Sequence, residues 1–275
     1  DTMGWNSADY IHILTEVERR AYADRAEHLG DDDFWDVPAE MLASKNYAKA
    51  RITDISMTKA TPSKDVFSGP PPGYESTETT HYSVVDKDGY SVAVTTTINL
   101  GYGGGNLVAG AGFFLNNEMD DFSIKPGVPN AYGLVGNEAN AVAATKRPLS
   151  SMTPTILLYD GKPMMTIGTP GGSTIITTVL QCIINVVLHG MDIKEAVCSP
   201  RVHHQWLPPD AISVEPRSIS KEIIKILESR GHIIMLYQGG SSKQSYIGEA
   251  NGILITEDGL YGAGDCRGET SAVGY

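Results

Sequence analysis

Two stretches in the first half of the chain mix apolar and hydroxyl residues in the way that half-exposed strands do. They cover residues 79–85 and 92–99, and both are rich in Val, Thr and Tyr, which favour strands. Between them, Asp86-Lys87-Asp88-Gly89 provides the positive-φ positions that a tight turn needs. The pattern therefore predicts a β-hairpin over residues 79–99.

The register of this hairpin decides which hydroxyl groups meet at its open end. A loop of two or three residues places Thr79 opposite Ile98 or Thr97, within reach of the Thr97 hydroxyl if both side chains share a face. Alternation sends Thr97 and Asn99 to the same side, next to a glycine-rich loop at 101–105. This arrangement suits an N-terminal threonine nucleophile that is exposed when the chain cuts itself. It equally fits an ordinary Thr-rich sheet that is half exposed.

Helical periodicity dominates the N-terminal region. Asn6 or Ser7 is placed to cap a helix that runs to about Leu29 and stops at Gly30, and helical signals return over residues 37–51. From Thr53 to Glu78 the periodicity is lost among prolines, glycines and hydroxyl residues, which predicts an exposed tether. Such a tether serves either as an interdomain linker or as a cleavable junction.

The second half of the chain mixes hairpins with apolar helices. An irregular region over 101–140 precedes a hairpin at 153–167 and a helix at 174–189 that Gly190 closes. Further helices are predicted at 193–197 and 219–230, and further strands at 233–236, 246–247 and 253–255. Hairpins and helices in comparable amounts predict an α+β fold with sheets buried between helical layers.

Composition narrows the classes of function. A net charge of −12 disfavours a surface for nucleic acid or for anionic membranes. The three cysteines, Cys182, Cys198 and Cys266, are odd in number and widely spaced, which predicts buried or free thiols rather than disulfides or a zinc site. His203 and His204 are adjacent, and adjacent residues in a strand point to opposite faces, so they are not expected to share a metal.

Two loops carry groups that could take part in catalysis or binding. Gly171-Gly172 opens a helix, where unpaired backbone N–H groups can hold an oxyanion, although a plain strand-to-helix turn explains the glycines equally well. Glu118 and Asp121 could bind an ammonium group, or they could be solvated loop acids. Ser150 and Ser151 are either donors to a carboxylate or part of a turn. No Gly-x-Ser-x-Gly elbow occurs, which argues against a serine α/β-hydrolase.

Together these segments closely resemble the signature of the γ-glutamyltransferases (γ-glutamyltranspeptidases). The blocks that carry the resemblance follow the family's order along the chain: Thr79-Thr80-His81-Tyr82-Ser83, Val92 to Asn99, Leu115 to Phe122, Lys146 to Pro154, and Pro170-Gly171-Gly172-Ser173. Upstream, Ala21-Tyr22-Ala23-Asp24-Arg25 looks like the end of that family's large subunit. So many ordered blocks are unlikely to agree by chance.

The resemblance implies an N-terminal-nucleophile hydrolase with an αββα sandwich fold. It divides the chain into residues 1–78, the C-terminal part of a large subunit, and residues 79–275, a small catalytic subunit. It also implies that the zymogen cuts the Glu78–Thr79 bond itself. The Thr79 hydroxyl would then carry a γ-glutamyl group, typically from glutathione, to water or to an amino acid or peptide amine, with no cofactor and no metal.

The same resemblance gives each candidate residue a role. Thr79 is the nucleophile, Thr97 activates it, and the Gly171 and Gly172 amides form the oxyanion hole. The α-ammonium group of the substrate would be held by Asn99, Glu118 and Asp121, and its α-carboxylate by Ser150 and Ser151. Tyr132 belongs to a lid over about 126–136. Residue 118 is Glu where many relatives have Gln, and both suit an ammonium group.

The family's large subunit is much longer than residues 1–78 and supplies an arginine for the substrate carboxylate. The resemblance therefore implies that the remaining large-subunit segment is a partner in a heterodimer formed by cleavage. It also implies a periplasmic or extracellular location. The alternatives are a related acylase that removes a glutaryl side chain from a β-lactam, and a non-catalytic homologue.

Overall fold

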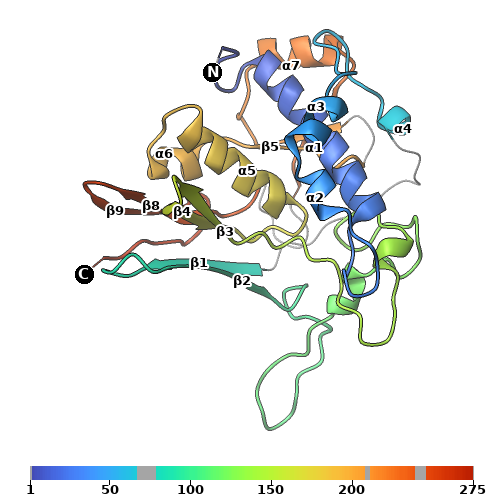
Figure 1. Ribbon diagram of the computed structural model, residues 1–275, viewed down its shortest axis with the longest axis vertical. Helices are drawn as coiled ribbons and strands as arrows, with labels where there is room; N and C mark the ends of the chain where they lie inside the picture. Colours follow the sequence, from blue (N-terminus) through green and yellow to red (C-terminus); the bar gives the residue numbers. More distant parts are fainter. Residues whose placement is uncertain (1, 67–78, 208–210, 239–245, 275) are drawn as a thin grey trace.

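Two antiparallel sheets face each other in the region where the predicted hairpins lie. In this computed structural model, which describes residues 2–66, 79–207, 211–238 and 246–274, the first sheet pairs β1 (Thr79–Val85) with β2 (Ser91–Thr97). The second has the order β3-β4-β8-β9, with bounds Thr155–Tyr159, Lys162–Gly168, Asn251–Thr256 and Gly259–Gly264. β1 packs on β4 and β8, and β2 packs on β3 and β4 (Figure 1). Both predicted hairpins are confirmed.

Helices cover the other face of the four-stranded sheet. α5 (Thr174–Val187) and α6 (Ile193–Cys198) lie there, and both were predicted within a few residues. Buried Met165 and Ile167 of β4 pack against Ile175 and Val179 of α5 to form the main hydrophobic core. The outward side chains of β1 and β2 are about half exposed, including Tyr82, Val84 and Val92. This chain therefore builds a helix–sheet–sheet stack.

A third sheet packs beside the N-terminal helix. It has the order β5-β6-β7, with bounds Val202–His203, Ala211–Val214 and Ile233–Leu236, and β6 pairs with β7 in parallel. In the core beside this sheet, Ile11 and Leu14 of α1 (Ala8–His28) pack with Ile212 of β6. Leu227 of α7 (Lys221–Ser229) belongs to the same core. The predicted strand at 246–247 is wrong, and the strands β5, β6 and β9 were not predicted.

The predicted cap of the first helix is confirmed. The Ser7 hydroxyl accepts the backbone N–H of Tyr10 at 3.1 Å. The helical region expected over 37–51 is two helices, α2 (Ala39–Leu42) and α3 (Lys45–Arg51). It divides because the Ser44 hydroxyl accepts the N–H of Tyr47 and caps a new helix. None of the helices within the described ranges is both long and apolar enough to span a bilayer.

The first part of the predicted tether is largely exposed, as expected, but hydrogen bonds hold it against α1. The Arg20 guanidinium donates to Asp54 at 3.0 Å, and the N–H of Thr61 donates to the buried Glu16 carboxylate at 3.0 Å. The chain continues into a short helix, α4 (Ser63–Val66). A buried Glu16 carboxylate would be costly without the Thr61 N–H and its two arginine partners. This explains why the segment around Thr61 lies against α1. Residues 67–78, including Glu78, lie outside the described residues.

The expectation of free thiols is wrong for two of the three cysteines. Cys198 and Cys266 form a disulfide across 68 residues of sequence, while Cys182 is a buried free thiol. Cys198 ends α6, and Cys266 follows β9, which packs on that helix. Sequence spacing gave no sign of this pairing because only the packing of α6 on β9 brings the two residues together.

Candidate active site

Thr79 and Thr97 meet at the open end of the first hairpin. They are direct partners in the β1–β2 register, and the Thr79 hydroxyl donates to the Thr97 hydroxyl at 3.3 Å. The Thr97 oxygen also accepts the backbone N–H of Asn99 at 2.8 Å. Of the two registers considered from the sequence, the structure has the one that brings the hydroxyl groups together. Thr79 is half-buried, so its oxygen lies at the edge of the packed region.

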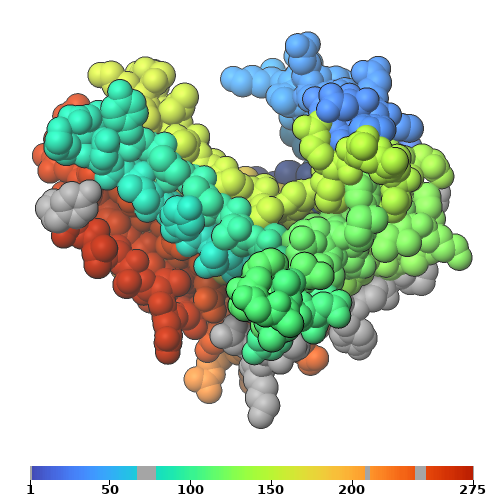
Figure 2. All heavy atoms as spheres, turned by 90° about the horizontal axis from the view of Figure 1, so that it is seen from below, coloured from blue at the N-terminus to red at the C-terminus, as the bar shows by residue number. Residues whose placement is uncertain are grey.

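Most of the predicted site residues surround one pocket next to this hydroxyl pair. Its lining comprises Thr79, Thr97, Asn99, Asp121, Tyr132, Ser150, Ser151, Met152, Gly172 and Ile175. Gly171 adjoins Gly172, and Glu118 lies against Asp121. Figure 2 shows the β1–β2 hairpin (teal) running across the lower face toward the green loops, with a wide notch between the hairpins and the blue N-terminal helices. Segments far apart in sequence therefore converge beside Thr79.

Two carboxyl groups lie side by side at one end of the pocket. Glu118 and Asp121 both belong to a short 3₁₀ helix, η1 (Glu118–Asp121), and their side chains share a hydrogen bond. Burial, followed by the adjacent Glu118 carboxyl, raises the pKa of Asp121 to about 7, while Arg25 opposes the rise. Burial also raises the pKa of Glu118. Two acids that are shielded from water and lack a strong cationic partner favour binding of a cation.

Asn99 is held in place beside these acids. It is buried, with a positive φ of 72°, and its amide nitrogen donates to the Asn117 carbonyl at 3.1 Å. The Asn117 side chain in turn accepts the N–H of Leu100 at 3.1 Å. These bonds fix the end of β2 to the segment that carries η1. Thr97 and Asp121 are therefore positioned by one local network.

The serine pair is supported by an arginine that the sequence analysis did not assign to the site. Arg25 of α1 donates to the Ser151 hydroxyl at 3.1 Å and also lies near Asp121. The Ser150 hydroxyl accepts the N–H of Met152 at 3.0 Å. Arg147 bonds Asp31 through its backbone N–H at 2.8 Å and its Nε at 3.0 Å, which anchors the chain just before the serines. Arg25 belongs to the family-like segment Ala21 to Arg25. Its contact with the pocket could not be predicted because it depends on how α1 packs.

The glycine pair forms a turn that other residues could not adopt easily. Gly171 has φ +142°, and a Cβ there would come within 2.5 Å of the Thr174 hydroxyl, while Gly172 has φ +57°. Among the residues that the structure describes, no protein acceptor takes the N–H of either glycine. The turn leads directly into α5, whose N-terminal end adds positive potential. The geometry is that of an anion-binding turn.

Tyr132 closes another side of the pocket. It is buried, and its hydroxyl donates to the Asn99 carbonyl at 2.6 Å. The predicted lid segment at 126–136 is held by local turns, in which the Asn130 side chain accepts the N–H groups of Tyr132 and Leu134. This segment therefore lies against the end of β2.

The contacts around the two histidine-containing clusters do not favour a metal site. His203 contacts Thr177 and Gln205, and His204 contacts Arg19 and the N–H of Trp206. His12 and His232 lie next to Glu16, but both carboxylate oxygens of Glu16 are bonded to arginines. Two guanidinium groups at that carboxylate would repel a cation. The expectation that His203 and His204 do not share a metal agrees with their separate contacts.

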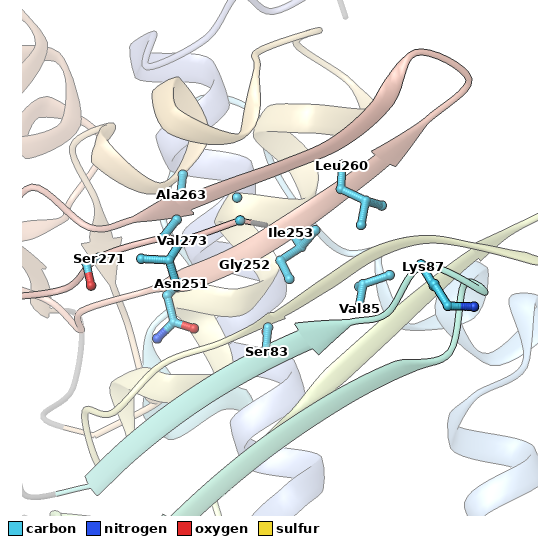
Figure 3. A pocket seen from close by; sticks show the side chains of 13 residues that line it. Ser83, Val85, Lys87, Asn251, Gly252, Ile253, Leu260, Ala263, Ser271 and Val273 are labelled. Carbon is cyan, nitrogen blue, oxygen red and sulfur yellow. The ribbon is translucent and has the colours of Figure 1, made fainter.

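A larger cavity of about 540 Å³ lies between β1 and the β8–β9 hairpin (Figure 3). Its lining is mostly small and apolar, with Val85, Ile253, Leu260 and residues 271–274 among the walls. Lys87 is at the hairpin end of this cavity and pairs with Asp88. No hydroxyl pair or acid pair lines it within the described ranges, so the pocket beside Thr79 is the better candidate for catalysis.

Sequence comparison links the whole chain to one family. The family model described as gamma-glutamyltranspeptidase matches residues 1–275. The glutathione hydrolase proenzyme of Escherichia coli (strain K12) is 51% identical over 265 residues, which cover 96% of this chain and 44% of that protein. The chain thus spans about half the length of the curated relatives it matches.

Comparison with solved structures supports the same family and its fold. A gamma-glutamyltranspeptidase from Pseudomonas nitroreducens, complexed with L-DON, is 42% identical with a TM-score of 0.66, and the match covers 71% of this chain and 99% of that one. A cephalosporin acylase from Bacillus halodurans reaches a TM-score of 0.78 over 96% of this chain and 45% of that one, at 24% identity. The second likeness concerns the fold alone. Together the matches confirm the predicted α+β class and N-terminal-nucleophile sandwich.

Proposed function

Because this chain belongs to the γ-glutamyltranspeptidase family, we propose that it is the C-terminal part of a proenzyme that cuts itself before Thr79. The new N-terminal threonine then transfers γ-glutamyl groups from glutathione and similar compounds to water or to an amino acid or peptide amine. The observation that carries the proposal is the Thr79–Thr97 hydroxyl pair at the mouth of a pocket that also contains Asp121, Ser151 and Gly172.

The share of the chain that matches a solved relative supports this division. Residues 79–275 make up about seven tenths of the sequence, and the Pseudomonas nitroreducens chain, matched over 99% of its length, covers 71% of this one. A large-subunit segment ending at residue 78 and a small subunit beginning at 79 would account for that share. The remaining large-subunit segment is then the partner of this chain in the mature heterodimer.

Cleavage and transfer use the same hydroxyl in two steps. In the precursor, the Thr79 oxygen attacks the carbonyl carbon of residue 78, the peptide C–N bond breaks, and water opens the resulting ester. The freed α-amine of Thr79 then accepts the hydroxyl proton when the oxygen attacks the γ-carbonyl of a substrate. That proton passes to the leaving amine, and an acyl-enzyme remains. Water or an acceptor amine then repeats the attack and releases Thr79.

The neighbours of Thr79 support these steps. Thr97 bonds the Thr79 hydroxyl and holds it in one direction, and the Gly171 and Gly172 N–H groups stabilise the oxyanion of each tetrahedral intermediate. No step requires a metal or an organic cofactor. The Gly171 conformation keeps the turn close to the helix α5, so no bulkier residue is expected to work there.

The rest of the pocket recognises the free amino acid end of the γ-glutamyl group. Asp121, Glu118 and Asn99 bind the α-ammonium, since burial and the adjacent Glu118 carboxyl raise the pKa of Asp121 and a cation would offset both effects. Ser150 and Ser151 donate to the α-carboxylate, with the Arg25 guanidinium beside them. An arginine from the missing large-subunit segment would complete this end. By likeness to the family, we place the enzyme in the periplasm or outside the cell.

The acid pair also favours γ-glutamyl substrates over the acylase alternative. A glutaryl side chain has the length of a γ-glutamyl group but lacks the ammonium, so it leaves Glu118 and Asp121 without a counterion. The cephalosporin acylase match, at 24% identity, supports a shared fold and gives no support to that substrate. A non-catalytic homologue would not need the acid pair, the hydroxyl pair and the glycine turn in one pocket.

The test compares the full-length proenzyme with its Thr79→Ala variant. Mass spectrometry of the wild-type protein should give a fragment that begins at Thr79, and γ-glutamyl anilide should be hydrolysed faster than glutaryl anilide. Thr79→Ala should abolish both cleavage and turnover. A different N-terminus would move the nucleophile, and preference for the glutaryl compound would favour the acylase. A variant that keeps its activity would overturn the proposal.

A further inference from the structure

A buried glutamine joins two walls of the candidate site. Gln205 follows β5 and is 7% exposed. Its Oε1 accepts the Ser173 hydroxyl at 2.7 Å, and its Nε2 donates to the Tyr132 carbonyl at 3.1 Å. Ser173 comes directly after the Gly171-Gly172 turn, and Tyr132 lines the pocket. One side chain therefore bonds both the glycine turn and the Tyr132 segment.

The network around Gln205 has a single pattern of donors and acceptors. Because Oε1 has no hydrogen, its second partner, His203 Nε2 at 2.8 Å, must be the donor. The Nδ1 atom of His203 lies 2.8 Å from the Thr177 hydroxyl, which also donates to the Thr174 carbonyl at 3.1 Å, so a neutral ring shares that hydroxyl hydrogen with the carbonyl. Burial lowers the pKa of His203 to about 4, so the ring stays neutral at ordinary pH. The tautomer of His203 therefore keeps the Gln205 amide in one orientation.

Further bonds extend both arms of this network to the reacting groups. The Tyr22 hydroxyl donates to the Ser173 carbonyl at 2.5 Å, which fixes the backbone that follows Gly172. On the other arm, the Tyr132 hydroxyl donates to the Asn99 carbonyl at 2.6 Å, two residues beyond Thr97. The glycine turn and the end of β2 are thus connected through Gln205 by short, buried hydrogen bonds.

We propose that Gln205 is a positioning residue, which holds the Gly171-Gly172 turn and the Tyr132 segment at the separation that acyl transfer on Thr79 requires. This inference rests on the proposed function. Without Gln205, a buried hydroxyl and a buried carbonyl lose their partners, and the segments that carry them shift to find others. A displacement of about 1 Å at a reacting centre can cost about a hundredfold in rate.

The chain offers a matched control in Gln181. This second buried glutamine also makes three hydrogen bonds, with Nε2 donating to the Thr177 and Val202 carbonyls at 2.9 and 2.8 Å, and Oε1 accepting the Val202 N–H at 3.1 Å. Its bonds join α5 to β5, and neither arm reaches Ser173 or Tyr132. Replacing either glutamine with methionine removes comparable bonds at similar volume.

The experiment measures kcat and KM for γ-glutamyl anilide with the full-length, self-cleaved protein, per mole of chain beginning at Thr79. Gln205→Met should lower kcat by about ten- to a hundredfold. Gln181→Met should lower the thermal stability about as much as Gln205→Met does. Its kcat should stay within about threefold of the wild-type value, because Gln181 lies away from the reacting groups. Ser173→Ala removes the hydroxyl that donates to Gln205 and leaves the Gln205 bond to Tyr132 in place, so kcat should fall while KM stays near the wild-type value.

Equal kcat losses in the two methionine variants would show a general packing effect and overturn the inference. A wild-type kcat in Gln205→Met would overturn it as well. If Gln205→Met does not fold, Ser173→Ala decides, because an unchanged kcat there refutes the positioning role. An inactive wild-type protein would instead refute the proposed function, so the two failures are distinguishable.

Discussion

Two aspartates that are shielded from water have opposite environments in this molecule. Asp265 receives donors from Arg201 at 2.6 Å, from Arg267 at 2.8 Å and from the N–H of Ala250 at 2.8 Å. Burial alone would raise the pKa of Asp265, but the two guanidinium groups outweigh it and lower the pKa. At Asp121, burial raises the pKa, and the nearest strong partner is another acid, Glu118.

The two carboxylates differ in whether their nearest strong partners are basic or acidic side chains. The Asp265 cluster, with Glu215 bonded to Arg267 and to the N–H groups of Arg201 and Ile247, has its charges paired inside the protein. The pair Glu118–Asp121 leaves negative charge uncompensated at a pocket wall. Buried charges are tolerated when paired, and this contrast supports the proposal that the substrate ammonium binds at Glu118 and Asp121.

The largest expected effect follows from breaking the Asp265 cluster. Asp265→Asn removes the carboxylate that pairs with the buried Arg201 and one of the two that pair with Arg267, and should reduce the free energy of unfolding by about 3–5 kcal/mol. Urea unfolding of the full-length protein measures the loss. Asp88→Asn is the control, since Asp88 is exposed and pairs only with Lys87, and it should stay within about 0.5 kcal/mol of wild type. Similar losses in both variants would contradict a structural role for Asp265.

The second largest loss of stability is expected from removing the disulfide that lies beside the Asp265 cluster. Cys266 lies between Asp265 and Arg267, and its bond to Cys198 closes a loop of 68 residues. Removing a cross-link of that span should reduce the free energy of unfolding by about 2–4 kcal/mol. The Cys198→Ser/Cys266→Ser double variant should unfold at lower urea and be insensitive to reductant, whereas the wild type should become less stable when reduced. A wild-type midpoint that reductant does not change would argue against the bond.

The sequence predicted the features that depend on neighbouring residues and missed those that depend on contacts between distant segments. Both hairpins, the Ser7 cap and the glycine turn follow from neighbouring residues, and the resemblance supplied the residues that meet beside Thr79. Arg25, Gln205 and the Cys198–Cys266 bond were missed because each acts through contacts between distant segments. β5 and β6 are short and lack a clear alternating pattern, so only their packing beside α1 makes them strands.

Asp121→Asn should affect binding and leave stability nearly unchanged, in contrast to Asp265→Asn. Losing the charge that faces the substrate ammonium should raise KM for γ-glutamyl anilide at least about tenfold, the equivalent of about 1.4 kcal/mol. Glutaryl anilide, which has no ammonium, is the control substrate, and its KM should not rise. If both KM values rise together, Asp121 shapes the pocket rather than binding the ammonium.

The smallest effect is a shift in pH dependence when Glu118 is replaced by Gln. In the wild type, Asp121 has a pKa of about 7, so it loses its proton, and attracts an ammonium, as the pH rises through that value. The inhibition constant of the product glutamate, which does not depend on the nucleophile, should therefore fall between about pH 6 and pH 8. Glu118→Gln removes the adjacent acid, lowers the pKa of Asp121 and moves this midpoint to lower pH.

Protein stability should change in the matching direction. The folded-state pKa of Asp121 lies above the ordinary aspartate value of 3.8, so its stabilising contribution is complete below that value and is lost as pH rises toward about 7. Glu118→Gln narrows the pH range over which this stability is lost, because it brings the folded-state pKa of Asp121 closer to 3.8. The variant should therefore lose less stability than the wild type between pH 4 and pH 7 in urea unfolding. Two results together would contradict this: the inhibition constant of glutamate changes at the same pH in the variant as in the wild type, and the stability profile is also unchanged. The two carboxyl groups then do not interact, and Asp121 alone sets the charge of the pocket.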